Sequence, residues 1–200
     1  PRKLTFRPGH YQKFWHKNCV AVGMSSGFLE PLEASALALI ELSITMISEQ
    51  LPVNRSHMDI VAKRYNERFE YRWQRVIEFL KLHYVLSQRN DSPYWRDNKS
   101  MDTIPSRLQE LLQLWQHQPP SRYDFIQNEE VFPSASYQYI LYGMRFNTEL
   151  RATESSYANI DLAKRIFNDC ELKLQKYLSG LPSNRDLINH LCQQHAVKKQ

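Results

Sequence analysis

Hydrophobic residues recur three and four positions apart over most of the chain, and this spacing predicts a mainly α-helical protein. Leu37, Ile40 and Ile44 begin one such stripe, and a longer stripe runs from Met58 to Leu80. We expect about six helices, over residues 33–50, 56–87, 106–116, 134–143, 160–178 and 184–194.

Proline and polar residues mark the breaks between these helices. Pro52 ends the first helix, and Ser56 is placed to cap the second. Residues 89–100 are mostly polar and predict a loop, whose Tyr94 and Trp95 can pack against the long helix.

The N-terminal part follows a different pattern. Residues 2–22 hold short apolar or β-prone stretches around the turn pair Pro8-Gly9, and the small-residue loop 23–27 follows them. Such short stretches are too few for an independent sheet. We therefore expect a few strands that belong to a sheet whose other members lie outside this chain.

Composition narrows the classes of partner. With 42% hydrophobic and 24% charged residues, the 200-residue chain is expected to fold around a core. The net charge is +5, but Lys and Arg alternate with Glu67 and Glu70, which is typical of a solvated helix face and not of a nucleic-acid site. The most apolar run, 34–47, contains Glu41 and is shorter than the ~20 residues of a membrane span.

Cysteine usage favours a reducing compartment. Cys19, Cys170 and Cys192 are odd in number and far apart, so we expect no disulfide framework and a cytoplasmic protein. Cys192 and His195 form a lone pair, and the other histidines show no ligand spacing. The sequence therefore predicts no metal site.

The segment most able to carry chemistry is residues 20–33. It runs from an apolar stretch through small residues into the start of a helix, an arrangement that suits a phosphate, the edge of a flavin ring or an anion. Many such turns are purely structural, so the arrangement alone is weak evidence. Glu30 and Glu33 could likewise be only the acidic residues that favour a helix N-terminus.

The exact string is more specific. Residues 18–23, Asn-Cys-Val-Ala-Val-Gly, are followed at 25–33 by Ser-Ser-Gly-Phe-Leu-Glu-Pro-Leu-Glu, and together they closely resemble the signature of flavin-dependent tryptophan halogenases. Further blocks extend the resemblance over nearly the whole chain: Phe6-Arg7-Pro8-Gly9 with Trp15, His83-Tyr84 with Ser87, Arg89, Asp91 and Pro93-Tyr94-Trp95-Arg96, and Leu181-Pro182-Ser183 with Ile188 and Cys192.

The resemblance implies an oxidoreductase that halogenates tryptophan, an indole or another electron-rich aromatic ring. In this family reduced FAD, oxygen and chloride or bromide give hypohalous acid, which reaches a ring held at a distance. A separate flavin reductase supplies the reduced FAD. A lysine outside this chain and a glutamate matching Glu33 handle the electrophile, and a carboxylate there can accept the proton that the ring loses.

The resemblance also assigns binding residues and two domains. Residues 1–33 would end a flavin-monooxygenase-type FAD-binding domain, and residues 34–200 would form a helical substrate-binding module. The halide would lie at the backbone N–H groups of Ser35 and Ala36, although the family's usual Ser-Thr-Gly run is Ala34-Ser35-Ala36 here. The residues expected beside the flavin are Gly23, Ser25, Ser26, Gly27, Phe28, Leu29 and Pro31.

Part of the substrate pocket is expected from residues 128–137. Phe132 is the candidate ring to stack on an aromatic substrate, Glu129 or Glu130 could bind a substrate amine, and Tyr137 is a further candidate. In contrast, the stripe positions of Phe69 and Trp73 predict core residues.

Two other functions stay open at this stage. A flavin monooxygenase-type enzyme that does not halogenate is favoured by the altered run after Glu33, and a non-enzymatic helical interaction module would need no further sequence. The chain carries no GxGxxG fingerprint, which we expect in an N-terminal half outside it together with the catalytic lysine. The chain alone is therefore expected to be inactive. A homodimer stays open, and no nucleic-acid or membrane partner is expected.

Overall fold

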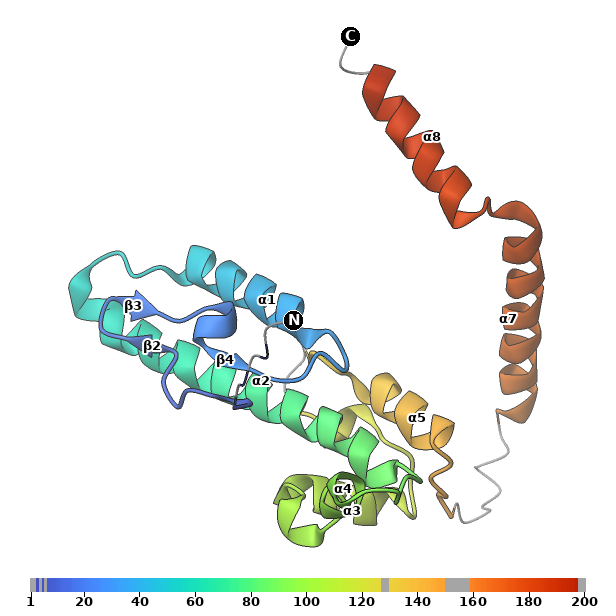
Figure 1. The fold of residues 1–200 in the computed structure, drawn as a ribbon, viewed down its shortest axis with the longest axis horizontal. Coiled ribbons are helices and arrows are strands. Elements are labelled where there is room, and N and C mark those ends of the chain that lie inside the picture. The colour runs from blue at the N-terminus through green and yellow to red at the C-terminus, as the bar shows by residue number, and fades with distance from the viewer. Residues whose placement is uncertain (1–2, 4, 6, 127–129, 150–158, 198–200) are drawn as a thin grey trace. The chain divides into compact units, whose positions relative to one another are not determined.

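The computed structural model describes residues 3, 5, 7–126, 130–149 and 159–197 (Figure 1). The chain divides into two compact units, residues 1–150 and residues 151–200. This division follows packing alone. The functional boundary expected after residue 33 concerns a different property and stays a prediction.

Four strands of two residues each precede the first long helix in the described part of unit 1. They are β1 (Gly9–His10), β2 (Trp15–His16), β3 (Cys19–Val20) and β4 (Gly27–Phe28), with the 3-10 turn η1 (Gly23–Ser25) before β4. Antiparallel pairing joins β1 to β4 and β2 to β3. β4 lies at the end of the stretch expected to be loop, because Gly27 pairs closely with the backbone at His10.

Helices make up the rest of unit 1, and α2 is its long axis. In Figure 1 this helix (green) extends along the strands and α1, and α1, β2 and α5 all contact it. The helical elements are α1 (Ser35–Gln50), η2 (Arg55–His57), α2 (Met58–Leu86), α3 (Pro93–Asp97), η3 (Met101–Thr103), α4 (Ser106–Trp115), η4 (Arg122–Asp124) and α5 (Ser134–Gly143).

Three local expectations were wrong, each because a nearby residue fixes the backbone. α1 begins at Ser35 and not at residue 33, since Ala34 has a left-handed φ of 50° that a right-handed helix cannot include. Ser56 caps no helix, because its hydroxyl donates to Asn54, whose side chain caps η2. The expected loop at 89–100 contains α3, which Pro93 starts at its first turn.

Aromatic rings dominate the core of unit 1. One cluster joins the strands and α1 to α2 between Ala62 and Leu80, and there Phe69 and Trp73 are buried, as predicted. The second cluster joins the end of α2 to α4 and α5, with Trp115 fully buried. Phe132 packs against both clusters from the segment before α5. Tyr94 and Trp95 pack against Tyr84 of α2, which confirms that prediction too.

Charged side chains are also buried along α2. Glu78 is 4% exposed and accepts from Arg75 Nη2 and from Arg107 Nη1 of α4, each at 2.7 Å. Burial raises the pKa of Glu78, and the two guanidinium groups act against that rise. This paired network fastens α4 to α2, because a buried carboxylate needs its partners.

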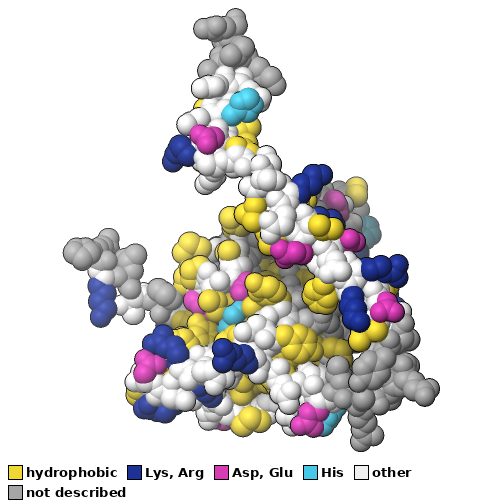
Figure 2. Space-filling model, turned by 90° about the vertical axis from the view of Figure 1, so that its right-hand side faces the viewer, with side chains coloured by type: hydrophobic (Ala, Val, Ile, Leu, Met, Phe, Trp, Pro, Cys, Tyr) yellow, Lys and Arg dark blue, Asp and Glu magenta, His cyan; other side chains and the backbone are white. Residues whose placement is uncertain are grey.

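The described residues of unit 2 form α7 (Ile160–Gly180) and α8 (Asn184–Val197). Among the described residues, no helix is both long and apolar enough to span a membrane. On the face drawn in Figure 2, Lys and Arg side chains are scattered among Asp and Glu.

The expectation of a mainly helical protein with few strands is confirmed. Membership of those strands in an FAD-binding sheet stays a prediction.

Candidate functional site

Residues 23–36 surround a small, mostly apolar hollow of about 200 Å³, here called the loop cavity. It lies between the β4 segment and the first turns of α1, and Trp73 of α2 also lines it. Of the residues expected beside the flavin or halide, the cavity is lined by Gly23, Ser26, Gly27, Phe28, Leu29, Pro31, Ser35 and Ala36. The structure therefore brings together nearly all of that predicted set.

The two glycines of this loop have structural reasons of their own. A Cβ at Gly27 would lie 2.7 Å from the carbonyl oxygen of Gly9 and from His10 Cα, so β1 could not approach. Gly23 has a left-handed φ of 64°, and a Cβ there would press on Ile40 at 3.2 Å. Proximity to a flavin is therefore not needed to explain either glycine, although both line the loop cavity.

The serines of the loop close the η1 turn. Ser25 Oγ donates to the Val22 carbonyl and accepts from the Val22 N–H, at 2.9 and 3.0 Å. Ser26 Oγ donates to the Gly23 carbonyl at 2.6 Å and is buried. Ser25 is exposed and, alone among the predicted cofactor residues, does not line the loop cavity.

The start of α1 leaves backbone donors uncapped. Ala34 is the N-cap residue and makes no side-chain cap hydrogen bond, so no side chain at that position satisfies the first N–H groups. Ser35 and Ala36 of this first turn line the loop cavity. A helix N-terminus of this kind favours an anion.

A second hollow of about 370 Å³ lies beside the first and is here called the carboxylate cavity. It brings Glu33 together with Phe79 of α2, Phe132, and Ala135, Ser136, Tyr139 and Ile140 of α5. Glu33 and Phe132, which the sequence predicted separately as catalytic and substrate-stacking residues, thus share one cavity. The segment from Glu33 to Ala36 borders both cavities, with the carboxylate on one side and the helix start on the other.

The Glu33 carboxylate is held in place by a histidine from α2. Its Oε1 lies 2.7 Å from Nε2 of His83, and the other ring nitrogen, Nδ1, lies 2.8 Å from the Phe79 carbonyl oxygen. The His83 side chain is 15% exposed and that of Glu33 is 31% exposed. Glu33 is thus partly desolvated and reachable from the carboxylate cavity.

Two other expected substrate residues, Tyr137 and Glu130, do not line this cavity. Tyr137 is 1% exposed and packs behind Phe79 against Trp115, and burial raises its pKa. Glu130 accepts a hydrogen bond from Tyr71 of α2 and does not line the cavity. Glu129 lies outside the described residues.

Phe132 is held as a wall of the cavity. Its ring stacks on Phe79 with centroids 4.0 Å apart and planes at 21°. Phe79 also faces the edge of His83 at 5.1 Å. One turn of α2 therefore supports both the aromatic wall and the carboxylate.

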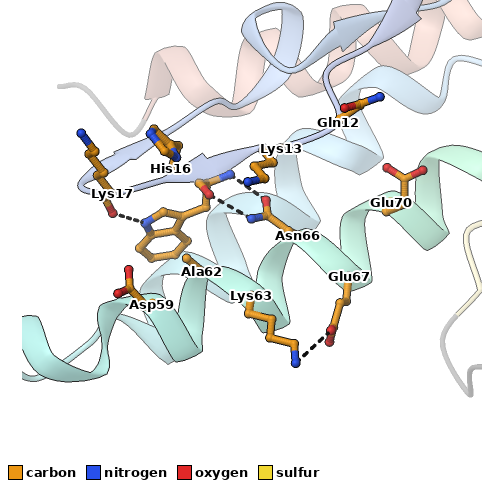
Figure 3. A pocket seen from close by; sticks show the side chains of 11 residues that line it. Gln12, Lys13, His16, Lys17, Asp59, Ala62, Lys63, Asn66, Glu67 and Glu70 are labelled. Atoms are coloured by element: carbon orange, nitrogen blue, oxygen red, sulfur yellow. Dashed lines mark hydrogen bonds and ion pairs between the residues drawn. The ribbon is translucent and has the colours of Figure 1, made fainter.

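A third hollow, of about 620 Å³, lies over β2 and the start of α2 (Figure 3). Its central contact is structural: Asn66 Oδ1 accepts from the N–H groups of Phe14 and Trp15 at 2.8 Å, and Asn66 Nδ2 donates to the Trp15 carbonyl. The charged side chains at its edge include an exposed Lys63–Glu67 pair. The hydrogen bonds of Asn66 anchor the β2–β3 hairpin on α2.

Within the described residues, no three His, Cys, Asp or Glu side chains gather as a metal site.

Comparison with known proteins decides the family. Residues 1–156 match the sequence profile described as tryptophan halogenase. The chain belongs to the tryptophan halogenase family. The match covers the strands, both cavities and the whole of unit 1.

Solved halogenase structures share this fold. A tryptophan halogenase from Shewanella frigidimarina superimposes with a TM-score of 0.89 at 48% identity, covering 96% of this chain and 36% of that chain. Tar14, a tryptophan C-6 flavin-dependent halogenase (chlorinase) from taromycin biosynthesis, gives a TM-score of 0.85 at 31% identity and covers 93% of this chain and 37% of its own. The tryptophan 6-halogenase SttH of Streptomyces toxytricini is 35% identical over 140 residues, 70% of this chain and 26% of that protein.

The chain spans roughly a quarter to two fifths of the length of these halogenases. Sequence reasoning selected Glu33 and the loop from a distinctive string and Phe132 from a looser resemblance, and the roles of these residues stay predictions. It did not find the partners of those residues. The helical spacing of Phe79 and His83 could have shown that they share a face of α2, but not what that face contacts.

Proposed function

We propose that the complete protein is a flavin-dependent halogenase that uses reduced FAD, oxygen and chloride or bromide to halogenate tryptophan, an indole or another electron-rich aromatic ring. Membership of the tryptophan halogenase family supports this function. The observation that carries it is the carboxylate cavity, where Glu33 and the Phe132 ring line one space of about 370 Å³. That volume lies within the range of small-ligand sites.

In this proposal the carboxylate cavity binds the substrate, and the loop cavity, on the other side of the 33–36 segment, binds the halide. On the carboxylate cavity side, an aromatic substrate lies against Phe132 with a ring carbon near Glu33, which accepts the proton displaced by the halogen. On the loop cavity side, the uncapped N–H groups of Ser35 and Ala36 hold the halide. The protein wall between the two cavities keeps the aromatic ring away from the flavin.

The residues around the loop cavity fit the edge of a flavin ring and not a whole FAD. The cavity is mostly apolar, as an aromatic ring edge requires, but about 200 Å³ is less than a complete ligand site. Bound reduced FAD would supply the activation of oxygen. Residues 1–33 would therefore complete an FAD-binding domain formed mostly by another part of the protein, and residues 34–200 would form the substrate module. A separate flavin reductase would keep the FAD reduced.

One observation favours a second candidate. Ala34-Ser35-Ala36 replaces the run Ser-Thr-Gly that is usual in the family, so a flavin monooxygenase-type enzyme that does not use halide is the alternative. Main-chain donors survive these replacements, which is why halogenation is preferred here.

Halide dependence separates the two functions. The complete protein is incubated with an FAD reductase system, air and either tryptophan or indole. The buffer contains chloride, bromide or no halide, and the products are identified by mass spectrometry. Halogenation predicts a product with the halogen isotope pattern only when halide and reduced FAD are both present. An oxygenated product of equal yield in all three buffers would establish the monooxygenase instead.

A further inference from the structure

His83 lies between two oxygen atoms that face its two ring nitrogens. Nδ1 is 2.8 Å from the Phe79 carbonyl, one turn earlier on α2, and Nε2 is 2.7 Å from Glu33 Oε1. Both contacts are within ordinary hydrogen-bond distance. The ring is mostly buried, so water does not compete freely for either nitrogen.

Counting protons at this histidine gives a definite result. A backbone carbonyl can only accept, so the hydrogen bond to Phe79 places a proton on Nδ1. A histidine with only that proton has a bare lone pair at Nε2, and an ionised carboxylate also lacks a proton. The 2.7 Å contact with Glu33 therefore needs one more proton, carried by Nε2 or by the carboxyl group.

This arrangement determines which oxygen of Glu33 is left for chemistry. Oε1 is occupied by His83, whereas Oε2 makes no hydrogen bond to any residue that the structure describes. Glu33 lines the carboxylate cavity together with Phe132, whose ring is stacked on Phe79. The residue that anchors His83 therefore also sets the aromatic wall.

We propose that His83 is the positioning residue of Glu33: it fixes the carboxylate at the cavity and holds the proton shared between the two side chains. The proposal rests on the proposed function only in taking Glu33 as the group that meets the substrate. His83 itself acts through Glu33 and touches no reacting atom. It enforces one orientation of the carboxylate, so Oε2 is presented to a ring carbon and Oε1 is not.

A double-mutant cycle in the complete protein tests the coupling. His83→Leu should lower kcat by about 10-fold or more while KM for the aromatic substrate changes little, since orientation of the proton acceptor is lost. In a Glu33→Gln background the same change should cost less than about 3-fold, because the coupled partner is already altered. His83→Gln, which retains a side-chain N–H donor, should recover part of the loss.

Two outcomes of the cycle would overturn the proposal. Equal losses from His83→Leu in both backgrounds would assign His83 a merely structural role, as would a failure of His83→Gln to recover activity when all variants melt alike. His57→Leu is the matched control, because His57 is exposed on η2 and bonds only to Asn54 among the described residues. Its turnover should equal that of the parent.

Nitrogen NMR of the histidine rings gives a readout that needs no turnover. In the complete protein, the ring signals that disappear in His83→Gln belong to His83. They should show a proton on Nδ1 and a further shared proton at Nε2, and Glu33→Gln should leave Nε2 as a bare acceptor. An Nε2 signal that Glu33→Gln does not move would refute the pair. If the pair is present but no halogenated product forms in any halide, the proposed function fails and the pair stands.

Discussion

Two of the segments that contribute a residue to the carboxylate cavity are held by different means. Residues 23–36 carry Glu33 and are shaped by their own backbone, through left-handed conformations at Gly23 and Ala34 and the close approach of Gly27 to β1. The second segment, residues 119–126 and 130–133, includes Phe132 and is held by side chains of distant helices. Arg107 of α4 donates to the Asp124 carbonyl there.

The second segment has further anchors of the same kind. Tyr71 of α2 donates to Glu130 and accepts weakly from the Ile126 N–H at 3.4 Å. Arg107 is in turn held by the buried carboxylate of Glu78. A segment set by its backbone should be sensitive to adding or removing one Cβ, whereas a segment set by buried charges should be sensitive to losing one charge.

The largest loss of stability is expected when the buried charge of Glu78 is removed. Glu78→Gln in the complete protein should lower the free energy of unfolding by about 3–5 kcal/mol, because Arg75 and Arg107 lose the carboxylate that compensates them. Denaturant unfolding measures the change. Glu67→Gln is the control, since the exposed Lys63–Glu67 pair at 3.8 Å should be worth less than about 1 kcal/mol. Similar losses in both variants would mean that the buried network does not hold this region.

The next largest effect is a loss of turnover when Glu33, in the segment 23–36, is changed. Glu33→Gln keeps the shape of the side chain but removes the proton acceptor, so halogenation by the complete protein should fall about 100-fold. Product formation is followed by chromatography under reduced FAD and halide. Glu41→Gln, on the exposed side of α1, should retain the parent rate. Turnover of the Glu33 variant within a few-fold of the parent would remove Glu33 from the reaction.

A smaller loss is expected from one added methyl group in the loop. Gly27→Ala should lower the free energy of unfolding by about 1–3 kcal/mol, because its Cβ would meet Gly9 and His10 backbone atoms at 2.7 Å. Gly143→Ala provides the comparison, since no atom lies within 4 Å of a Cβ there. That variant should be neutral or gain up to about 1 kcal/mol from helix propensity. Thermal and denaturant unfolding should therefore show a loss of stability in Gly27→Ala and none in Gly143→Ala, and equal losses would contradict the close-approach argument.

The smallest expected effect is a gain in stability from a change at Ala34. Ala34 is held at a φ of 50°, which a residue with a Cβ adopts at a cost, so Ala34→Gly should stabilise the complete protein by about 0.5–1 kcal/mol. Ala36→Gly, two residues later and inside α1, should instead cost up to about 1 kcal/mol. Loss of stability in Ala34→Gly would show that the left-handed conformation carries no strain.

Local periodicity was sufficient to predict most helices. The expected helix at 134–143 coincides with α5, and the expected helices at 106–116 and 160–178 end within two residues of α4 and α7. These elements depend on side chains three and four positions apart, which the sequence displays directly. The loop and Glu33 were likewise predictable, because a resemblance to a known family rests on a continuous string.

Tertiary structure decided which residues of that string face which cavity, and with what partner. Tyr137 shares a short segment with Phe132, yet it is buried behind Phe79 while Phe132 lines the carboxylate cavity. Glu33 and His83 are 50 positions apart and meet only because α2 runs beneath the loop. A contact between distant residues leaves no spacing pattern in either segment, since its geometry depends on how whole helices pack. The sequence by itself thus determined the helices and the candidate carboxylate, and only packing along α2 determined how that carboxylate is held.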